Sequence, residues 1–164
     1  MLDASSAVAC SGPSGSTAGD VSRGVCRMLL RHDIVALAEV PLEGGRRVDL
    51  MAMDGRGKLI IVEIKVSRAD LLGDCKWTEY LDHCDRFYWA VPPGFDVEPL
   101  SRADFLPERS GLIVADRYDG AIVREASESV VASAARKRTT LAFARRAARR
   151  LISLADPEAE TGLG

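Results

Sequence analysis

The sequence KLIIVEIKVS at residues 58–67 constrains the fold more than any other stretch. Runs rich in Ile and Val over about eight residues are typical of β-strands rather than helices. Alternate side chains of a strand point to opposite faces, so positions 60, 62, 64 and 66 form an apolar face, and Glu63 and Lys65 share the other. Such charges are costly to bury unless they pair or bind a metal ion. The stretch predicts either a structural Glu–Lys pair on a half-exposed strand or a functional site.

Length and composition indicate one ordinary globular domain. The chain has 164 residues, of which 47% are apolar and 28% charged, enough for a single core. No apolar run is long enough to span a membrane, and no basic residue precedes Arg23, where a secretory signal would need one. We therefore expect a cytoplasmic protein without membrane association.

The four cysteines include no C-x-x-C pair, so neither a zinc site nor a disulfide framework is expected. Cys75, His83 and Cys84 can be drawn as metal ligands, but a buried free thiol is the commoner fate of such a cysteine. Reduced cysteines agree with a cytoplasmic protein.

The chain is expected to divide into three segments. Residues 1–20, mostly Ser, Gly and Ala, are expected to form a disordered tail, residues 21–155 the folded domain and residues 156–164 a flexible acidic tail. The domain is expected to open with a short helix from Asp20 or Ser22, with Ser22 as its N-cap.

Three strands are expected next, at residues 34–42, 46–54 and 58–67, joined by two three-residue turns that contain glycine. Counting outward from these turns places Glu39 opposite Asp49, and Asp49 opposite Glu63. Directly opposed residues share a face of the sheet, so the three carboxylates would form a row with Lys65 beside them. A slip of one residue in either turn would break the row.

A row of three carboxylates is unstable without a cation. Oxygen ligands of this kind suit Mg²⁺ or Mn²⁺, and such an ion can polarise a phosphoryl oxygen and activate a bound water. Lys65 could orient that water or neutralise charge that develops on the phosphate. The combination predicts phosphodiester hydrolysis.

The arrangement of Asp49 and the Glu63–Ile64–Lys65 triplet on successive strands resembles the PD-(D/E)XK nuclease superfamily, with Val48 in place of the proline of its name. Residues 23–126 resemble more closely the MmcB-type family of bacterial DNA-repair proteins, which are taken to be endonucleases. The segments that carry this resemblance are EVPL (39–42), GRRVDL (45–50), IVEIKVSRADL (61–71) and KWTEYLDHCDRFYWAVPP (76–93).

The resemblance implies a single α/β domain, in which a mixed central sheet flanked by helices forms a restriction-endonuclease-like αβββαβ core. It implies Asp49 and Glu63 as metal ligands, the main-chain carbonyl of Ile64 as a further ligand and Lys65 as the catalytic lysine. Many superfamily members also carry a glutamate on the first helix. That helix has no acid between Val21 and Arg31 here, so Glu39 is the substitute candidate. Many nucleases of this fold cut as dimers, which makes a homodimer one expectation.

The rest of the chain adds a helix, a strand and a hairpin. Residues 68–84 have apolar positions at helical spacing, although Gly73 weakens a helix. Within this helix, Trp77 is expected in the core, whereas Lys76 is equally a solvated lysine or a phosphate contact. Residues 86–92 predict the fourth strand, and residues 111–117 and 121–125 a hairpin around Asp119–Gly120.

A long basic helix is expected at residues 132–155. Its apolar stripe would consist of Leu141, Ala144, Ala148, Leu151 and Ala155. It also carries seven positive charges and no acid. Residues 1–133 carry a net charge of −6 and residues 156–164 a net charge of −3, so the charge is segregated. A basic helix beside an acidic metal site suits DNA, and the expected contacts are Arg145, Arg146, Arg149 and Arg150.

Two functions remain open at this point. One is a Mg²⁺-dependent DNA endonuclease that acts in repair together with other repair proteins. The other is a DNA-binding repair module that keeps the nuclease fold but cleaves little or nothing. A weaker third reading makes the acidic row structural and gives the basic helix to an acidic protein partner.

Overall fold

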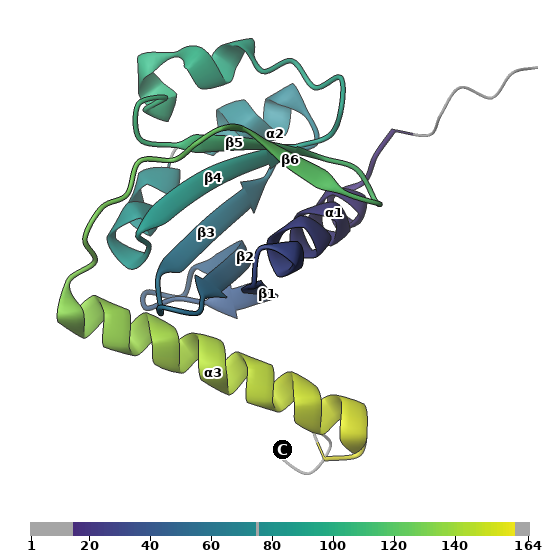
Figure 1. Cartoon of the computed structure of the whole chain (residues 1–164), viewed down its shortest axis with the longest axis vertical. Helices are drawn as coiled ribbons and strands as arrows, with labels where there is room; N and C mark the ends of the chain where they lie inside the picture. Colours follow the sequence, from purple (N-terminus) through teal and green to yellow (C-terminus); the bar gives the residue numbers. More distant parts are fainter. Residues whose placement is uncertain (1–14, 75, 160–164) are drawn as a thin grey trace, which may run out of the picture.

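The computed structural model describes residues 15–74 and 76–159, which form one mixed six-stranded sheet flanked by helices (Figure 1). The strands are β1 (Ile34–Pro41), β2 (Arg47–Asp54), β3 (Leu59–Ile64), β4 (Arg86–Val91), β5 (Gly111–Ala115) and β6 (Gly120–Arg124). The helices are α1 (Ala18–Arg31), α2 (Arg68–Gly73) and α3 (Ser133–Ala155), with 3₁₀ turns η1 (Trp77–His83), η2 (Glu98–Ser101) and η3 (Ala103–Phe105). The predicted fold class, with its added hairpin and long C-terminal helix, is confirmed.

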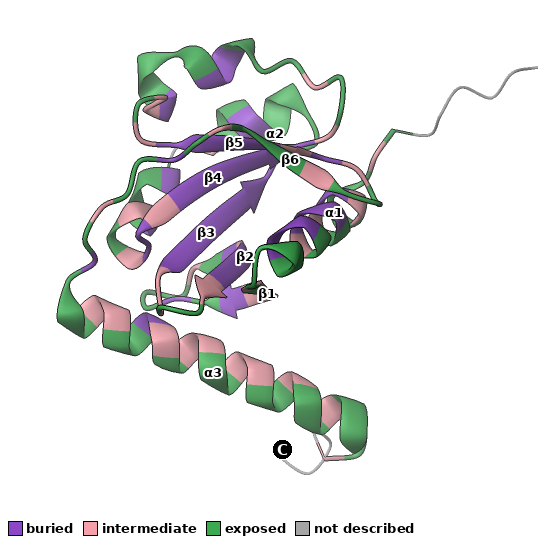
Figure 2. Cartoon of the chain, viewed as in Figure 1, coloured by how far each residue is buried: buried purple, intermediate pink, exposed green. Residues whose placement is uncertain are grey.

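The strands lie in sequence order across the sheet. β1, β2 and β3 form an antiparallel meander, β3, β4 and β5 are parallel, and β6 returns antiparallel to β5. β3 lies inside the sheet and is buried along its whole length (Figure 2), as its run of branched apolar residues predicts. The segment that carries Glu63 is therefore in the most enclosed part of the molecule.

The predicted register of the meander is confirmed. Val40 pairs with Val48 and Leu50 pairs with Val62, and the backbone N–H of Asp54 donates to the Lys58 carbonyl at 3.2 Å. These pairs belong to the registers that place Glu39 opposite Asp49, and Asp49 opposite Glu63. The two glycine-containing turns determine the alignment, because turn length sets the pairing of a hairpin.

Helix α1 begins earlier than predicted, at Ala18. Thr17, not Ser22, caps it: the Thr17 side chain accepts from the Asp20 backbone N–H, and the Asp20 carboxylate accepts from the Thr17 backbone N–H, which completes a capping box. α1 covers one face of the sheet (Figure 1). Gly24 permits close contact with the β5–β6 turn, since a Cβ there would lie 1.9 Å from the Asp116 carbonyl oxygen.

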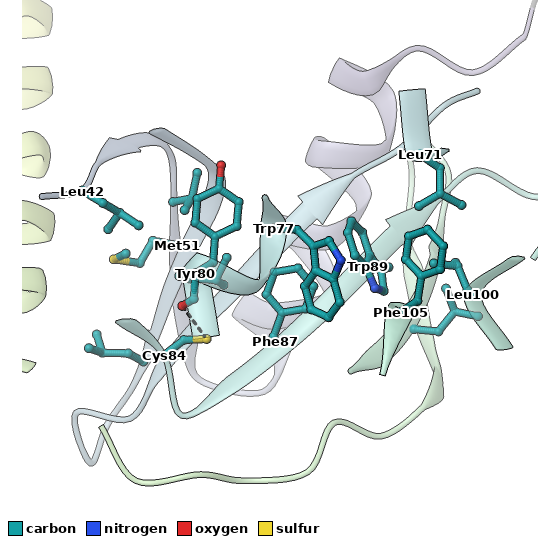
Figure 3. Close-up of a cluster of buried hydrophobic side chains, with 14 of the residues drawn as sticks. Leu42, Met51, Leu71, Trp77, Tyr80, Cys84, Phe87, Trp89, Leu100 and Phe105 are labelled. Carbon is teal, nitrogen blue, oxygen red and sulfur yellow. Dashed lines mark hydrogen bonds between the residues drawn. The ribbon is translucent and has the colours of Figure 1, made fainter. Parts of the chain in front are cut away.

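An aromatic core fills the other face of the sheet (Figure 3). Trp77 lies there as predicted, with its ring 5.0 Å from both Phe87 and Trp89. The single helix predicted over residues 68–84 is wrong, because α2 ends at Gly73 and a 3₁₀ turn follows. Glycine at that position favours the break. Cys84 is a buried thiol as predicted and donates to the Tyr80 carbonyl.

Helix α3 contacts β1 and η1 and otherwise stands clear of the sheet (Figure 1). The predicted apolar stripe is wrong, because all five of its residues are exposed; Leu141 is 57% and Leu151 67% exposed. The packed side carries instead the buried Thr139 and the half-buried Ala142 and Phe143. Helical periodicity separates the two sides of α3 but does not say which one meets the sheet.

Several predictions concern residues outside the described ranges. They include residues 1–14 of the expected N-terminal tail, the end of the acidic tail at residues 160–164, and Cys10 and Cys75. Among the described helices, none is both long and apolar enough to cross a membrane.

Candidate functional site

Asp49 and Glu63 meet at the point where the β2–β3 ladder ends. Beyond the pair Leu50–Val62, the carboxylates bond to the neighbouring backbone. The Asp49 N–H donates to Glu63 Oε1 at 3.1 Å, and the Ile64 N–H donates to Asp49 Oδ2 at 2.8 Å. These reciprocal bonds fix the direction of both carboxylates, so the predicted pairing is present as a side-chain contact.

Both carboxylates are electrostatically strained. Burial, together with the negative charge of Asp49, raises the pKa of Glu63 to about 8. Burial also raises the pKa of Asp49, against the lowering effect of the Ile64 N–H bond and of Lys65. Two buried acids side by side disfavour simultaneous ionisation unless a proton or a cation compensates their charge.

Lys65 is the cation that faces this pair, and it is only 6% exposed. Its ammonium lies 2.9 Å from Asp74 Oδ2, 3.9 Å from Asp70 Oδ1 and 4.0 Å from Glu63 Oε2. Burial alone would lower the pKa of Lys65, but these carboxylates outweigh burial and raise it. Lys65 is therefore held charged beside Glu63, with Asp74 as its hydrogen-bond partner.

Asp70 and Asp74 are site residues that the sequence reasoning missed. The Ser67 side chain caps α2 by accepting from the Asp70 N–H at 3.1 Å, which puts Asp70 in the first turn. Asp74 follows directly after the end of α2 at Gly73. The available signal was the pair of aspartates in and directly after this short helix, five and nine residues after Lys65.

Glu39 is placed near the pair but is turned toward another partner. Its carboxylate forms an ion pair with Arg47, and its backbone has φ +61°, a left-handed conformation that is costly for a residue with a side chain. Val40 and Val48 join the aromatic-side core even though the alternation of β1 and β2 would put them on the α1 side. The alternation of side chains between the two sides of the sheet is therefore interrupted at Glu39 in β1 and at Asp49 in β2.

The site residues other than Asp74 line one hollow of about 390 Å³ at the N-terminus of α1. The lining includes Ala18, Gly19, Glu39, Asp49, Glu63, Ile64, Lys65 and Asp70. The predicted catalytic residues and all four predicted ligand positions thus border one space. Within residues 15–74 and 76–159, however, no three His, Cys, Asp or Glu side chains are arranged to hold a metal ion. The predicted row of three ligands is reduced to the pair Asp49 and Glu63, because Glu39 is engaged by Arg47.

The donor set still suits a divalent cation. Asp49 and Glu63 supply carboxylate oxygens, the ligand type that Mg²⁺ and Mn²⁺ prefer, and these ions commonly use only one or two carboxylates together with water and substrate phosphate. The raised pKa of Glu63 indicates the same need for positive charge. We therefore retain Asp49 and Glu63 as the residues that would hold such an ion.

The basic residues of α3 have two different surroundings. Arg136 is structural: its guanidinium donates to both oxygens of the buried Asp85, at 2.9 and 2.7 Å. Arg138 pairs with Glu43 at 2.6 Å. Arg145, Arg146 and Arg149 border, together with Arg138, a second hollow beside Pro41 of β1.

Two other predicted DNA contacts lie apart from that hollow. Arg150 lies on the packed side of α3, near Cys26 of α1, where its charge opposes the burial that raises the pKa of the Cys26 thiol. Lys76 is exposed directly before η1. A role of either residue in DNA binding stays a prediction.

Comparison with known proteins agrees with the segment-level resemblance. A solved protein of unknown function from Silicibacter pomeroyi is 44% identical, with a TM-score of 0.76, over 85% of this chain and 92% of that chain. SfsA of Pyrococcus furiosus, solved in complex with Ca²⁺, is 14% identical over 62% of this chain and 59% of that chain, with a TM-score of 0.32, too low to support a structural argument. No curated protein matches. The model of the MmcB-like DNA repair proteins matches residues 6–158, and the chain therefore belongs to the MmcB-like family.

Proposed function

We propose that this protein is a metal-dependent DNA endonuclease that acts in DNA repair. The observation that carries the proposal is the enclosed group of Asp49, Glu63 and Lys65 in one hollow, with a lysine ammonium 4.0 Å from one of two mutually repelling carboxylates. A purely structural Glu–Lys pair has no need of the second carboxylate, which raises the pKa of Glu63 further. The family supports the repair role, and the site supports the hydrolytic one.

The residues of the site have distinct roles in this proposal. Asp49 and Glu63 hold Mg²⁺ or Mn²⁺, with the Ile64 carbonyl as a further oxygen ligand. When bound, the ion would supply Lewis-acid charge at a phosphoryl oxygen and lower the pKa of a bound water. Lys65 orients the attacking water and neutralises charge that develops on the phosphate. Asp74 keeps the Lys65 ammonium in place through its 2.9 Å hydrogen bond.

DNA reaches the site through positive charge outside it. The hollow itself is lined by four acids and one lysine, so it would repel a phosphate chain when no metal ion is bound. The arginines of α3 that border the adjacent hollow compensate for this repulsion, because phosphate contacts supply most of the affinity of such complexes.

A second candidate is a DNA-binding repair module that does not cut. Two observations favour it: Glu39, the substitute third ligand, is paired with Arg47, and the described residues form no cluster of three metal-binding side chains. In this case the Asp49–Glu63 pair would be a remnant of the fold without catalytic use.

A cleavage assay separates the two candidates. Purified protein is incubated with nicked, branched and single-stranded DNA in Mg²⁺, in Mn²⁺ and in EDTA, beside the variants Asp49→Asn, Glu63→Gln and Lys65→Met. Glu98→Gln is the matched control, because Glu98 pairs with Arg102 on the remote η2 turn. Circular dichroism confirms that each variant is folded.

The nuclease proposal expects metal-dependent cutting that is lost in the three site variants and kept in Glu98→Gln. Binding of DNA without cutting in any metal, unchanged in the site variants, would establish the accessory module instead. Cutting that persists in EDTA would contradict the metal requirement. Cutting that persists in Glu63→Gln would contradict the role of Glu63 as a metal ligand.

A further inference from the structure

We propose that the groove between α3 and β1 holds a nucleotide of single-stranded DNA, so that the protein recognises DNA with an unpaired strand. The inference deepens the proposed function by naming the substrate class that enters the site. The binding it predicts does not require cleavage.

The lining of the groove combines two kinds of surface. Its volume is about 380 Å³, and it is lined by the apolar residues Pro41, Leu141 and Ala142 and by arginines of α3. A duplex presents phosphates and sugars outward and keeps its bases stacked inside, so it would leave the apolar residues uncovered. A single strand offers a phosphate and an unstacked base to the same place, and arginine can contact both.

The charges of two lining arginines are available to a ligand. Within the described part of the chain, Arg145 and Arg149 form no ion pair, whereas Arg136 and Arg138 on the same helix each do. Arg145 and Arg149 are four residues apart on a helix and lie about 6 Å apart along its axis. Both are exposed and can therefore reach phosphates on one strand.

Arg146 also lines the groove, but it is less available than its neighbours. Its Nε is buried and finds no hydrogen-bond acceptor among residues 15–74 and 76–159. A ligand in the groove cannot reach an atom without exposed surface, so the phosphate contacts are assigned to Arg145 and Arg149.

The groove is also next to the candidate site. Pro41 borders the groove and Glu39 borders the carboxylate hollow, and the two residues are about 7 Å apart along the edge strand. A strand with one nucleotide in the groove therefore needs little further length to place a neighbouring phosphate beside Asp49 and Glu63.

Anisotropy of labelled DNA in EDTA tests the inference without any cleavage. The probes are an oligothymidylate of about 16 nucleotides, at the upper end of common site sizes, and a blunt duplex of equal length. We expect tighter binding of the single strand, and a loss of about tenfold or more in the Arg145→Ala/Arg149→Ala double variant. The control is Arg31→Ala/Arg102→Ala, which removes the same charge from exposed ion pairs elsewhere.

Leu141→Asn tests the apolar part of the groove. Leu141 is 57% exposed, so the variant should remain folded. It should weaken oligothymidylate binding about threefold while leaving duplex binding unchanged, since contact of a base with an aliphatic side chain is worth less than the roughly tenfold per base of aromatic stacking.

Several outcomes would overturn the inference. Equal or tighter duplex binding would refute the single-strand preference. An equal loss of binding in Arg31→Ala/Arg102→Ala would mean that net charge alone, and not the groove, accounts for the effect. Polyglutamate that displaces the oligothymidylate and binds more tightly would reassign the groove to an acidic protein partner. A protein that binds single strands in EDTA but never cuts DNA leaves the inference standing and refutes only the nuclease proposal.

Discussion

The side chain of Glu63 is ionised only at an energetic cost, because it is buried beside Asp49. Its pKa of about 8 in the folded chain exceeds the ordinary value of 4.5, so the folded state binds a proton more tightly than the unfolded state does. In EDTA, the free energy of unfolding should therefore fall as pH rises from about 4.5 to 8 and level off above that. The loss should be a few kcal/mol at most, since one pKa unit corresponds to about 1.36 kcal/mol.

Chemical denaturation across this pH range measures the effect. Glu63→Gln should flatten the slope and be the more stable protein at pH 8, because its side chain carries no charge. The remote Glu98→Gln variant should keep the slope of the parent. A parent protein whose stability does not fall over this range would mean that the Glu63 carboxylate is not strained by Asp49.

Glu39 is the second residue with a testable local cost. Glu39 has a left-handed backbone with a φ of +61°, which costs a residue with a side chain roughly 1–2 kcal/mol. The exposed ion pair of Glu39 with Arg47 offsets little of this cost. Glu39→Gly should therefore keep or raise the melting temperature, whereas Glu39→Val should lower it, because a β-branched residue tolerates that conformation least. Equal melting temperatures of the two variants would contradict a left-handed Glu39.

The sequence predicts the positions of those site residues that depend on strand pairing. It does not predict those that depend on the local backbone conformation. Asp49 and Glu63 were placed together because the lengths of two glycine turns determine the register. The orientation of Glu39 depends on a backbone conformation that no spacing rule gives. Asp74 contacts Lys65 only because α2 ends at Gly73. A glycine predicts a less stable helix at this position, but not that the helix ends there.

At the scale of elements, α3 shows the limit of periodicity. The chain offers two sides of this helix, one with Leu and Ala at heptad-like spacing and one with Thr139 and Phe143. The second side packs, since it meets β1 and η1, and His83 of η1 lies within hydrogen-bond distance of Thr139, at 3.4 Å. Which side a helix buries depends on the shape of its neighbours, which the sequence of the helix alone does not contain.

A pair of substitutions on α3 tests this orientation. Leu151→Gln should change the free energy of unfolding by no more than about 0.5 kcal/mol, because Leu151 is 67% exposed. Phe143→Ala should lower it by about 1–2 kcal/mol, less than a fully buried phenylalanine would, because Phe143 is half-buried against the core. Urea denaturation of both variants decides the matter, and the reverse order would mean that the Leu–Ala stripe is the buried side.

At the scale of the whole molecule, charge is divided between an acidic body and one basic helix. Residues 1–133 carry a net charge of −6, residues 134–155 carry +7 and residues 156–164 carry −3. The overall charge of −2 therefore hides a surface that both attracts and repels nucleic acid. DNA should approach along α3, and the strength of that attraction should depend steeply on ionic strength.

The salt dependence of DNA binding measures how many phosphates the basic helix contacts. Each phosphate neutralised on a single strand contributes a slope of about −0.7 to the logarithm of the binding constant against the logarithm of salt concentration. If Arg145 and Arg149 each contact one phosphate, removing both should make the slope shallower by about 1.4. Titrations of oligothymidylate in EDTA at several salt concentrations measure it, with Arg31→Ala/Arg102→Ala as the control of unchanged slope. A slope that stays the same in the α3 variant would mean that these arginines affect binding without touching the phosphate chain.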